Sequence, residues 1–203
     1  MMETPQLNLK SEKNFAKIIS TITQPPLVSI PTFAVINFFL LGAGNSIVIT
    51  MICLIFGAFL PVLTSLILIK KMNIDLDITD RTKRTLPLLF AVGSYITGFF
   101  VLYSINAPAP TTALMFIYFT NTLTILFINM SWKISIHAMG VAGPTAALTY
   151  VFGFPGIIFG LIIPLVMWSR VELGKHTVLQ VFVGALLGLI ITAVQLYYIT
   201  PII

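Results

Sequence analysis

The chain has 203 residues, of which 58% are hydrophobic and only 8% are charged, and its mean hydropathy is +1.03. Because soluble domains carry about 25% charged residues, this composition excludes an ordinary soluble domain and predicts a polytopic membrane protein. Its surroundings are then membrane lipids, and we expect no nucleic-acid partner for its net charge of +5. Cys53, the one cysteine, lies inside an apolar run, which excludes an intrachain disulfide and a cysteine-based metal site.

Residues 1–26 form an N-terminal tail that is polar at first and mixed later. From Ser11 onward, four apolar residues share one helical face, with lysines elsewhere: Phe15, Ile18, Ile19 and Ile22. This pattern predicts a short amphipathic helix that lies on the membrane surface and ends at Pro25-Pro26. A disordered tail is the alternative interpretation.

Seven apolar segments follow, each near the ~20 residues that a spanning helix needs. They are predicted at about 27–44, 46–69, 86–104, 111–130, 134–152, 155–168 and 177–199. The pattern predicts an all-α bundle of about six to seven transmembrane helices, with residues 27–203 as a single domain. Glycine pairs at helix-packing spacing, such as Gly184 and Gly188, predict close contacts between helices.

The charged residues support this segmentation. With seven spans, all eleven lysines and arginines and all six acidic residues fall on one side of the membrane, and none falls on the other. The positive-inside rule then places the charged face in the cytoplasm and the C-terminus outside. We therefore expect an integral, multi-pass cell-membrane protein, with a homo-oligomer left open.

The segment 168–180 suggests where the chemistry lies. His176 is flanked by Arg170 and Lys175, and a new apolar helix begins just after it. A helix start offers unpaired backbone N–H groups and a partial positive charge, which suit an anion such as phosphate. The pattern is typical of a phosphoryl-transfer site.

Two other helices are predicted to begin on the same face. Before the third span, Thr85 is a candidate N-cap and Pro87 fits the first turn; this start also carries Arg81, Lys83 and Arg84. The fifth span starts with Lys133, Ser135 and His137. Convergence of these ends predicts one anion site at the membrane surface, where a lipid offers its head group while its tail stays in the bilayer.

Two histidines suit two steps of phosphate-ester cleavage, because one can attack phosphorus while the other protonates the leaving alkoxide. Arginine side chains hold the phosphoryl oxygens and stabilise the charge of the transition state. This chemistry requires neither a metal nor a cofactor.

These motifs resemble a known family, the type 2 phosphatidic acid phosphatase and haloperoxidase-like superfamily. Ser169-Arg170, five residues and His176 resemble its third signature, which is Ser-Arg, five residues, His, three residues and Asp. Ser135-Ile136-His137-Ala138 resembles its second signature, Pro-Ser-Gly-His. The first signature, a Lys, six residues and Arg-Pro, has a looser counterpart in Arg81, Lys83, Arg84 and Pro87. The resemblance covers roughly residues 80–190.

The resemblance implies an integral membrane phosphatase for a lipid phosphate or an isoprenoid (di)phosphate, with His176 as nucleophile and His137 as general acid. It implies phosphate binding by Arg170, Ser135, Arg81, Lys83 and Arg84, and position adds Lys133. Gln180 stands where the family has the Asp that orients the nucleophilic histidine. A Gln oxygen can accept the imidazole N–H bond but lacks the charge that stabilises imidazolium.

Other interpretations stay open. A catalytically weakened relative would bind lipid phosphates without cleaving them, and a small transporter would use polar residues inside the spans. An Asp-rich loop could hold Mg²⁺ on a diphosphate, as in membrane prenyltransferases: Asp75, Asp77 and Asp80. Such enzymes need two Asp motifs, and the sequence has one. The basic cluster before the third span could instead set topology or bind lipid head groups.

Overall fold

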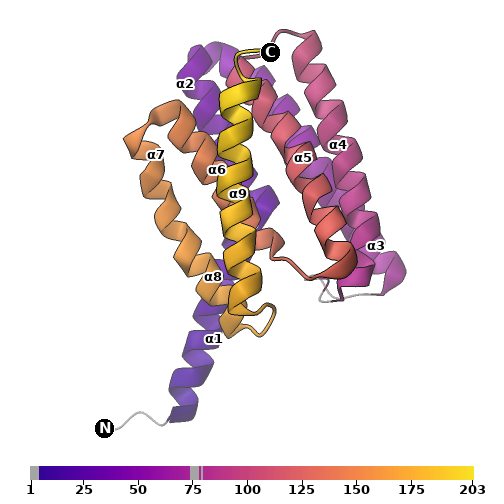
Figure 1. The fold of residues 1–203 in the computed structure, drawn as a ribbon, viewed down its shortest axis with the longest axis vertical. Coiled ribbons are helices and arrows are strands. Elements are labelled where there is room, and N and C mark those ends of the chain that lie inside the picture. The colour runs from indigo at the N-terminus through magenta and orange to yellow at the C-terminus, as the bar shows by residue number, and fades with distance from the viewer. Residues whose placement is uncertain (1–4, 74–77, 79) are drawn as a thin grey trace.

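The computed structural model describes residues 5–73, 78 and 80–203, with only the backbone for residues 5–10. The fold is all-α, as predicted (Figure 1). In chain order the elements are α1 (Pro5–Ile22), α2 (Pro25–Leu54), the π-helical turn η1 (Ile55–Phe59), α3 (Leu60–Met72), the 3₁₀ turn η2 (Arg81–Arg84), α4 (Thr85–Ser104), α5 (Ala109–Ser131), α6 (Ile136–Phe152), α7 (Phe154–Ile158), the 3₁₀ turn η3 (Phe159–Leu161), α8 (Ile162–Glu172) and α9 (Val178–Ile199).

Within the described part of the chain, five helical stretches are long and apolar enough to cross a membrane. They are Pro25–Met72, Arg81–Ser104, Ala109–Ser131, Phe154–Glu172 and Val178–Ile199. The protein is therefore a multi-pass membrane protein. Helix α6, with 17 residues, is shorter than these stretches and lies among them.

The longest stretch folds back on itself inside α2. Gly42 has φ 73° and ψ 175°, a conformation that suits glycine and interrupts the helix. The Asn37 side chain donates to Thr50 Oγ1 at 3.1 Å and lies 3.8 Å from Cys53 Sγ. A straight helix would separate residues 37 and 53 by about 24 Å along its axis. The chain thus reverses close to the predicted connection at Gly44-Asn45.

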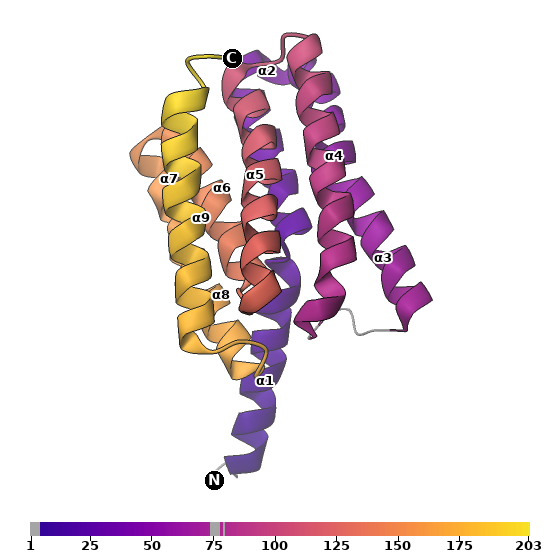
Figure 2. The ribbon, with the colours of Figure 1, turned by 45° about the vertical axis from the view of Figure 1, so that its right-hand side comes forward.

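The second half of this hairpin bends away from the bundle. The π-helical turn η1 precedes Pro61, which has no backbone N–H to continue the helical hydrogen bonds. The Ser94 hydroxyl of α4 donates to the Phe56 carbonyl of η1 at 2.7 Å, so a neighbouring helix supports the turn. Figure 2 shows α3 diverging from the bundle toward its lower end. This bend leaves the space beside α4 that the site uses.

The closest helix contact joins α6 and α9. A Cβ on Gly184 would lie 2.7 Å from the Ser135 carbonyl oxygen, and one on Gly188 would lie 2.8 Å from the Met139 carbonyl oxygen. Only glycine permits this approach, so the close contact predicted for the pair is confirmed. It brings the first turns of α6 and α9 side by side.

The charged residues lie in elements at one end of the bundle. Those of the described chain belong to α1, the end of α3, η2, the α5–α6 connection and the end of α8 with the connection that follows it. In Figures 1 and 2 these segments gather at the lower end, opposite the C-terminus.

The N-terminal helix is present, and its long axis follows that of the bundle. Helix α1 ends at Ile22, just before the proline pair, as expected. It packs against α8, with the rings of Phe15 and Trp168 5.8 Å apart and Ala16 fully buried. In both views it projects beyond the bundle along the long axis rather than lying across the end. The small side chain of Ala16 allows this lengthwise packing.

Adding one methyl group tests the contact between α6 and α9. Gly184→Ala places a carbon 2.7 Å from a backbone oxygen, and we expect overpacking to lower the free energy of unfolding by about 1–3 kcal/mol. Gly93→Ala on α4 is the matched control, because nothing lies within 4 Å of its added carbon. Thermal unfolding in detergent compares the two. Equal melting temperatures would contradict the close contact.

Candidate functional site

A cavity of about 350 Å³, here called the outer cavity, brings both histidines and two arginines together. These four residues are Arg84, His137, Arg170 and His176. Arg84 directly precedes α4, His137 lies in the first turn of α6, and His176 directly precedes the N-cap of α9. The outer cavity therefore gathers residues from all three helix starts that the sequence predicted to converge.

Hydrogen bonds tie these helix starts together. The Ser135 N–H before α6 donates to the Gln180 carbonyl in the first turn of α9 at 3.3 Å. Arg84 donates through Nη1 to the Ile134 carbonyl at 3.3 Å and through Nε to the Ile78 carbonyl at 2.7 Å. The three elements thus hold one another without a ligand.

The histidine before α9 is oriented by Gln180. Oε1 of Gln180 lies 3.0 Å from His176 Nδ1 and also accepts the Thr177 backbone N–H at 3.2 Å. A backbone N–H can only donate, so the atom facing His176 is the amide oxygen, and Nδ1 must carry the proton. Nε2 then keeps its lone pair. The same Gln180 closes a capping box with Thr177, which fixes the start of α9.

His176 is neutral at physiological pH. Its pKa is lowered from the ordinary value of 6.5 to about 3. Burial of the ring is the largest cause, because burial disfavours the charged imidazolium. The positive charges of Arg84, Arg170 and Lys133 act in the same direction, and the hydrogen bond to Gln180 opposes them. A neutral imidazole with a free Nε2 is the form that can attack an electrophile.

Arg84 and Arg170 are both buried, at 4% and 1% exposed. Arg170 donates through Nη1 to Ser20 Oγ at 2.5 Å. Guanidinium stays charged at all physiological pH values. Two buried positive charges therefore lie at the same cavity as the two histidines.

The remaining predicted site residues lie outside the lining of the outer cavity. Ser135 is fully buried as the N-cap of α6, and its Oγ accepts the Ala138 N–H at 3.3 Å. Lys133 is half-buried and acts on His176 through its charge. Lys83 is exposed.

Arg81 caps a helix. It donates through Nη1 to the Asn129 carbonyl at 2.9 Å and the Met130 carbonyl at 2.5 Å, at the end of α5. Asn129 returns a bond from Nδ2 to the Arg81 carbonyl at 2.7 Å. These contacts use Arg81 to satisfy the last carbonyls of α5, so its predicted phosphate contact has no support in this arrangement.

Two local predictions near η2 have different outcomes. Thr85 is the first residue of α4 rather than an N-cap, and Asp80 caps η2 by accepting the Thr82 N–H at 3.0 Å. The hydroxyl bond from Thr82 is the main cause that lowers the pKa of the Asp80 carboxyl. Asp75 and Asp77 lie outside the described residues, and the described residues hold no group of three His, Cys, Asp or Glu side chains that could bind a metal.

Sequence reasoning missed two walls of the outer cavity. One is the face of α3 formed by Pro61, Val62, Ser65, Leu66 and Ile69. The other is the α1–α2 junction, with Gln24, Pro25 and Pro26. From the sequence, an apolar helix face that lines a cavity looks the same as one that contacts lipid. The proline pair predicts only a helix end.

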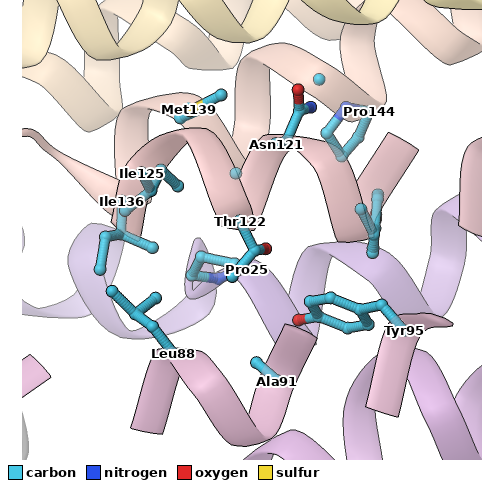
Figure 3. Close-up of a pocket in the computed structure, with 13 residues that line it drawn as sticks. Pro25, Leu88, Ala91, Tyr95, Asn121, Thr122, Ile125, Ile136, Met139 and Pro144 are labelled. Carbon is cyan, nitrogen blue, oxygen red and sulfur yellow. The ribbon is translucent and has the colours of Figure 1, made fainter. Parts of the chain in front are cut away.

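A second, smaller cavity continues from the first toward the middle of the bundle. This inner cavity, of about 100 Å³, shares five lining residues with the outer cavity: Pro25, Leu88, Ala91, Tyr95 and Ile136. Figure 3 shows Leu88, Ala91 and Tyr95 along one side, with Asn121 and Pro144 across from them. From Pro87 to Tyr95 this wall extends about 12 Å along α4, away from the charged end. The two cavities form one path from the charged end into the apolar interior.

The chain matches no protein-family model, no curated protein and no solved structure.

Histidine titration tests the electrostatics of the site. The chain has two histidines, so ¹⁵N-histidine labelling gives two ring systems, and His137→Gln assigns the signal of His176. We expect His176 to stay neutral from pH 8 to 5, because its pKa is about 3. Gln180→Glu should raise that pKa, since a carboxylate at the imidazole N–H favours imidazolium. A midpoint near the ordinary value in the native chain would contradict the site geometry.

Proposed function

We propose that this protein is an integral membrane phosphatase that cleaves a lipid phosphate or an isoprenoid (di)phosphate through a phosphohistidine on His176. The observation that carries the proposal is the outer cavity, where a neutral His176 oriented by Gln180 lies with His137, Arg84 and Arg170. The resemblance to the type 2 phosphatidic acid phosphatase and haloperoxidase-like superfamily in the same residues is consistent with this assignment.

The membrane arrangement that we propose has seven crossings. The 48-residue stretch Pro25–Met72 reverses at Gly42 and so provides two crossings. Helix α6 provides one more, because its 17 residues lie between α2, α5 and α9. The charged end of the bundle then faces the cytoplasm by the positive-inside rule, and the C-terminus lies outside.

The proposed reaction has two steps. His176 Nε2 attacks phosphorus, the P–O bond to the lipid breaks, and protonated His137 gives its proton to the leaving alkoxide. Water then attacks the phosphohistidine while His137 accepts the water proton, and inorganic phosphate leaves. Arg84 and Arg170 bind the phosphoryl oxygens and stabilise their charge in both transition states. The steps require no metal.

The apolar walls favour a lipid as substrate. The charged end of the outer cavity lies next to Pro87, Leu88 and Ala91 of α4, and the inner cavity extends this wall to mid-span. A hydrocarbon chain gains free energy by leaving water for such a surface. A small soluble phosphate ester gains nothing there. The inner cavity, of about 100 Å³, would take part of one hydrocarbon chain.

Gln180 favours a second candidate, a weakened relative that binds lipid phosphates and cleaves them slowly or not at all. The Gln180 oxygen orients the His176 ring but adds no negative charge to stabilise an imidazolium. Transport and Mg²⁺-dependent prenyl transfer stay as predictions without support from the contacts of the described residues.

Phosphate release by the purified protein tests the proposed function. Substrates are phosphatidic acid, phosphatidylglycerophosphate and polyprenyl (di)phosphates, each with EDTA present. We expect release by the native chain, a loss of several orders of magnitude in His176→Ala, and little change in Lys71→Ala, an exposed cation at the end of α3. Binding of these lipids without release would favour the weakened relative. Release that EDTA abolishes would contradict the metal-independent reaction.

Filling the inner cavity tests the path of the lipid chain. Ala91→Phe adds a ring where the two cavities meet, and we expect it to raise KM for long-chain substrates while a short-chain phosphate is cleaved as before. Leu89→Phe is the control, because Leu89 lies on the exposed face of α4 at 47% exposed. Equal effects of Ala91→Phe on short and long chains would place the hydrocarbon elsewhere.

A further inference from the structure

The N-terminal helix contacts the most deeply buried charge of the outer cavity. Arg170 Nη1 donates to Ser20 Oγ at 2.5 Å, across 150 positions of sequence. Arg170 is 1% exposed and Ser20 is 6% exposed, so the bond is shielded from water on both sides. It joins α1, which precedes the spanning bundle, to the last turn of α8.

The packing of α1 holds Ser20 in place. Among the described residues, α8 is the helix against which α1 packs most extensively, and α8 carries Arg170. Ala16, one turn before Ser20, is fully buried, and the ring of Phe15 contacts that of Trp168 in a tilted arrangement. Immediately after α1, Gln24 lines the outer cavity together with Arg170 and His176. The junction that directly follows α1 is therefore a wall of the outer cavity, and α1 itself contacts the site through Ser20 and Arg170.

We propose that Ser20 is a positioning residue for phosphate binding, and that α1 completes the phosphate site by fixing the guanidinium of Arg170 from behind. The inference deepens the proposed function and rests on it.

The chemistry of the hydroxyl suits this role. A guanidinium carries its N–H donors in a rigid plane, so the bond from Nη1 to Ser20 restricts the orientation of the whole group. Serine is neutral and leaves the positive charge of Arg170 intact. A carboxylate in the same place would offset that charge and compete with phosphate for the same donors.

Three substitutions at one position separate positioning from packing. Ser20→Ala removes the acceptor, Ser20→Thr keeps it, and Ser20→Asp replaces it with a charged competitor. The matched control is Thr23→Ala, because Thr23, directly after α1, is as buried as Ser20 but its hydroxyl donates to the Ile19 carbonyl of α1 at 2.6 Å. Thermal unfolding in detergent identifies any variant whose fold is disturbed.

The probe is inorganic phosphate, measured as a competitive inhibitor of release and by direct titration of the purified protein. We expect phosphate to bind about tenfold more weakly to Ser20→Ala, as loss of one hydrogen bond to a charged group implies. Binding to Ser20→Asp should be weaker still, Ser20→Thr should restore it, and Thr23→Ala should match the native chain.

The outcomes distinguish the two proposals. Equal phosphate affinities in Ser20→Ala and Thr23→Ala would overturn the positioning role even if the native chain releases phosphate from lipids. A native chain that binds phosphate by titration but cleaves no lipid would contradict the proposed function, and the Ser20 series would still decide the positioning role. A native chain that neither binds nor releases phosphate would overturn both.

Discussion

The close approach of α6 and α9 is the constraint on which the site depends. Gly184 and Gly188 allow two backbones to meet where any side chain would collide with a carbonyl oxygen. At that distance the Ser135 N–H reaches the Gln180 carbonyl, so the first turns of the two helices become one unit. His137 and His176 follow these turns into a shared cavity. In a bilayer, where lipid is as apolar as the helices, such close backbone packing is a main force that holds helices together.

The cations that we propose as phosphate ligands also influence the protonation of His176, the proposed nucleophile. Arg84, Arg170 and Lys133 lower the pKa of His176, and burial lowers it most. Burial and these cations therefore keep the imidazole neutral, which is the form that can act as a nucleophile. A bound phosphate dianion would offset the positive charge of the same cations and so lower the free-energy cost of a positive imidazole. This matters in the proposed reaction because attack on phosphorus creates positive charge on the ring. One set of residues thus serves binding and reactivity.

The sequence predicts the helices far better than their contacts. Hydropathy and proline or glycine breaks set the helix ends within a few residues, and charge placement predicts that three helix starts share one face. The sequence cannot distinguish the roles of Arg84, which lines the outer cavity, and Arg81, which caps α5, because both are cations before the same helix. The bond between Ser20 and Arg170 also escapes prediction, since a serine in an amphipathic tail carries no signal of a partner 150 residues away.

Gln180 shows how a departure from a familiar pattern can be structural as well as electrostatic. Its Oε1 accepts hydrogen bonds from both His176 Nδ1 and the Thr177 N–H, so one side chain orients the proposed nucleophile and caps α9. Attack by Nε2 places positive charge on an imidazole whose Nδ1 still carries its proton. A carboxylate would stabilise that charge, whereas the neutral Gln180 oxygen stabilises it less. In the proposed reaction, the first step is then slower than with Asp, and the phosphohistidine, being less stabilised, loses its phosphoryl group to water more readily. The proposed function together with Gln180 thus predicts a slow enzyme that does not accumulate its intermediate.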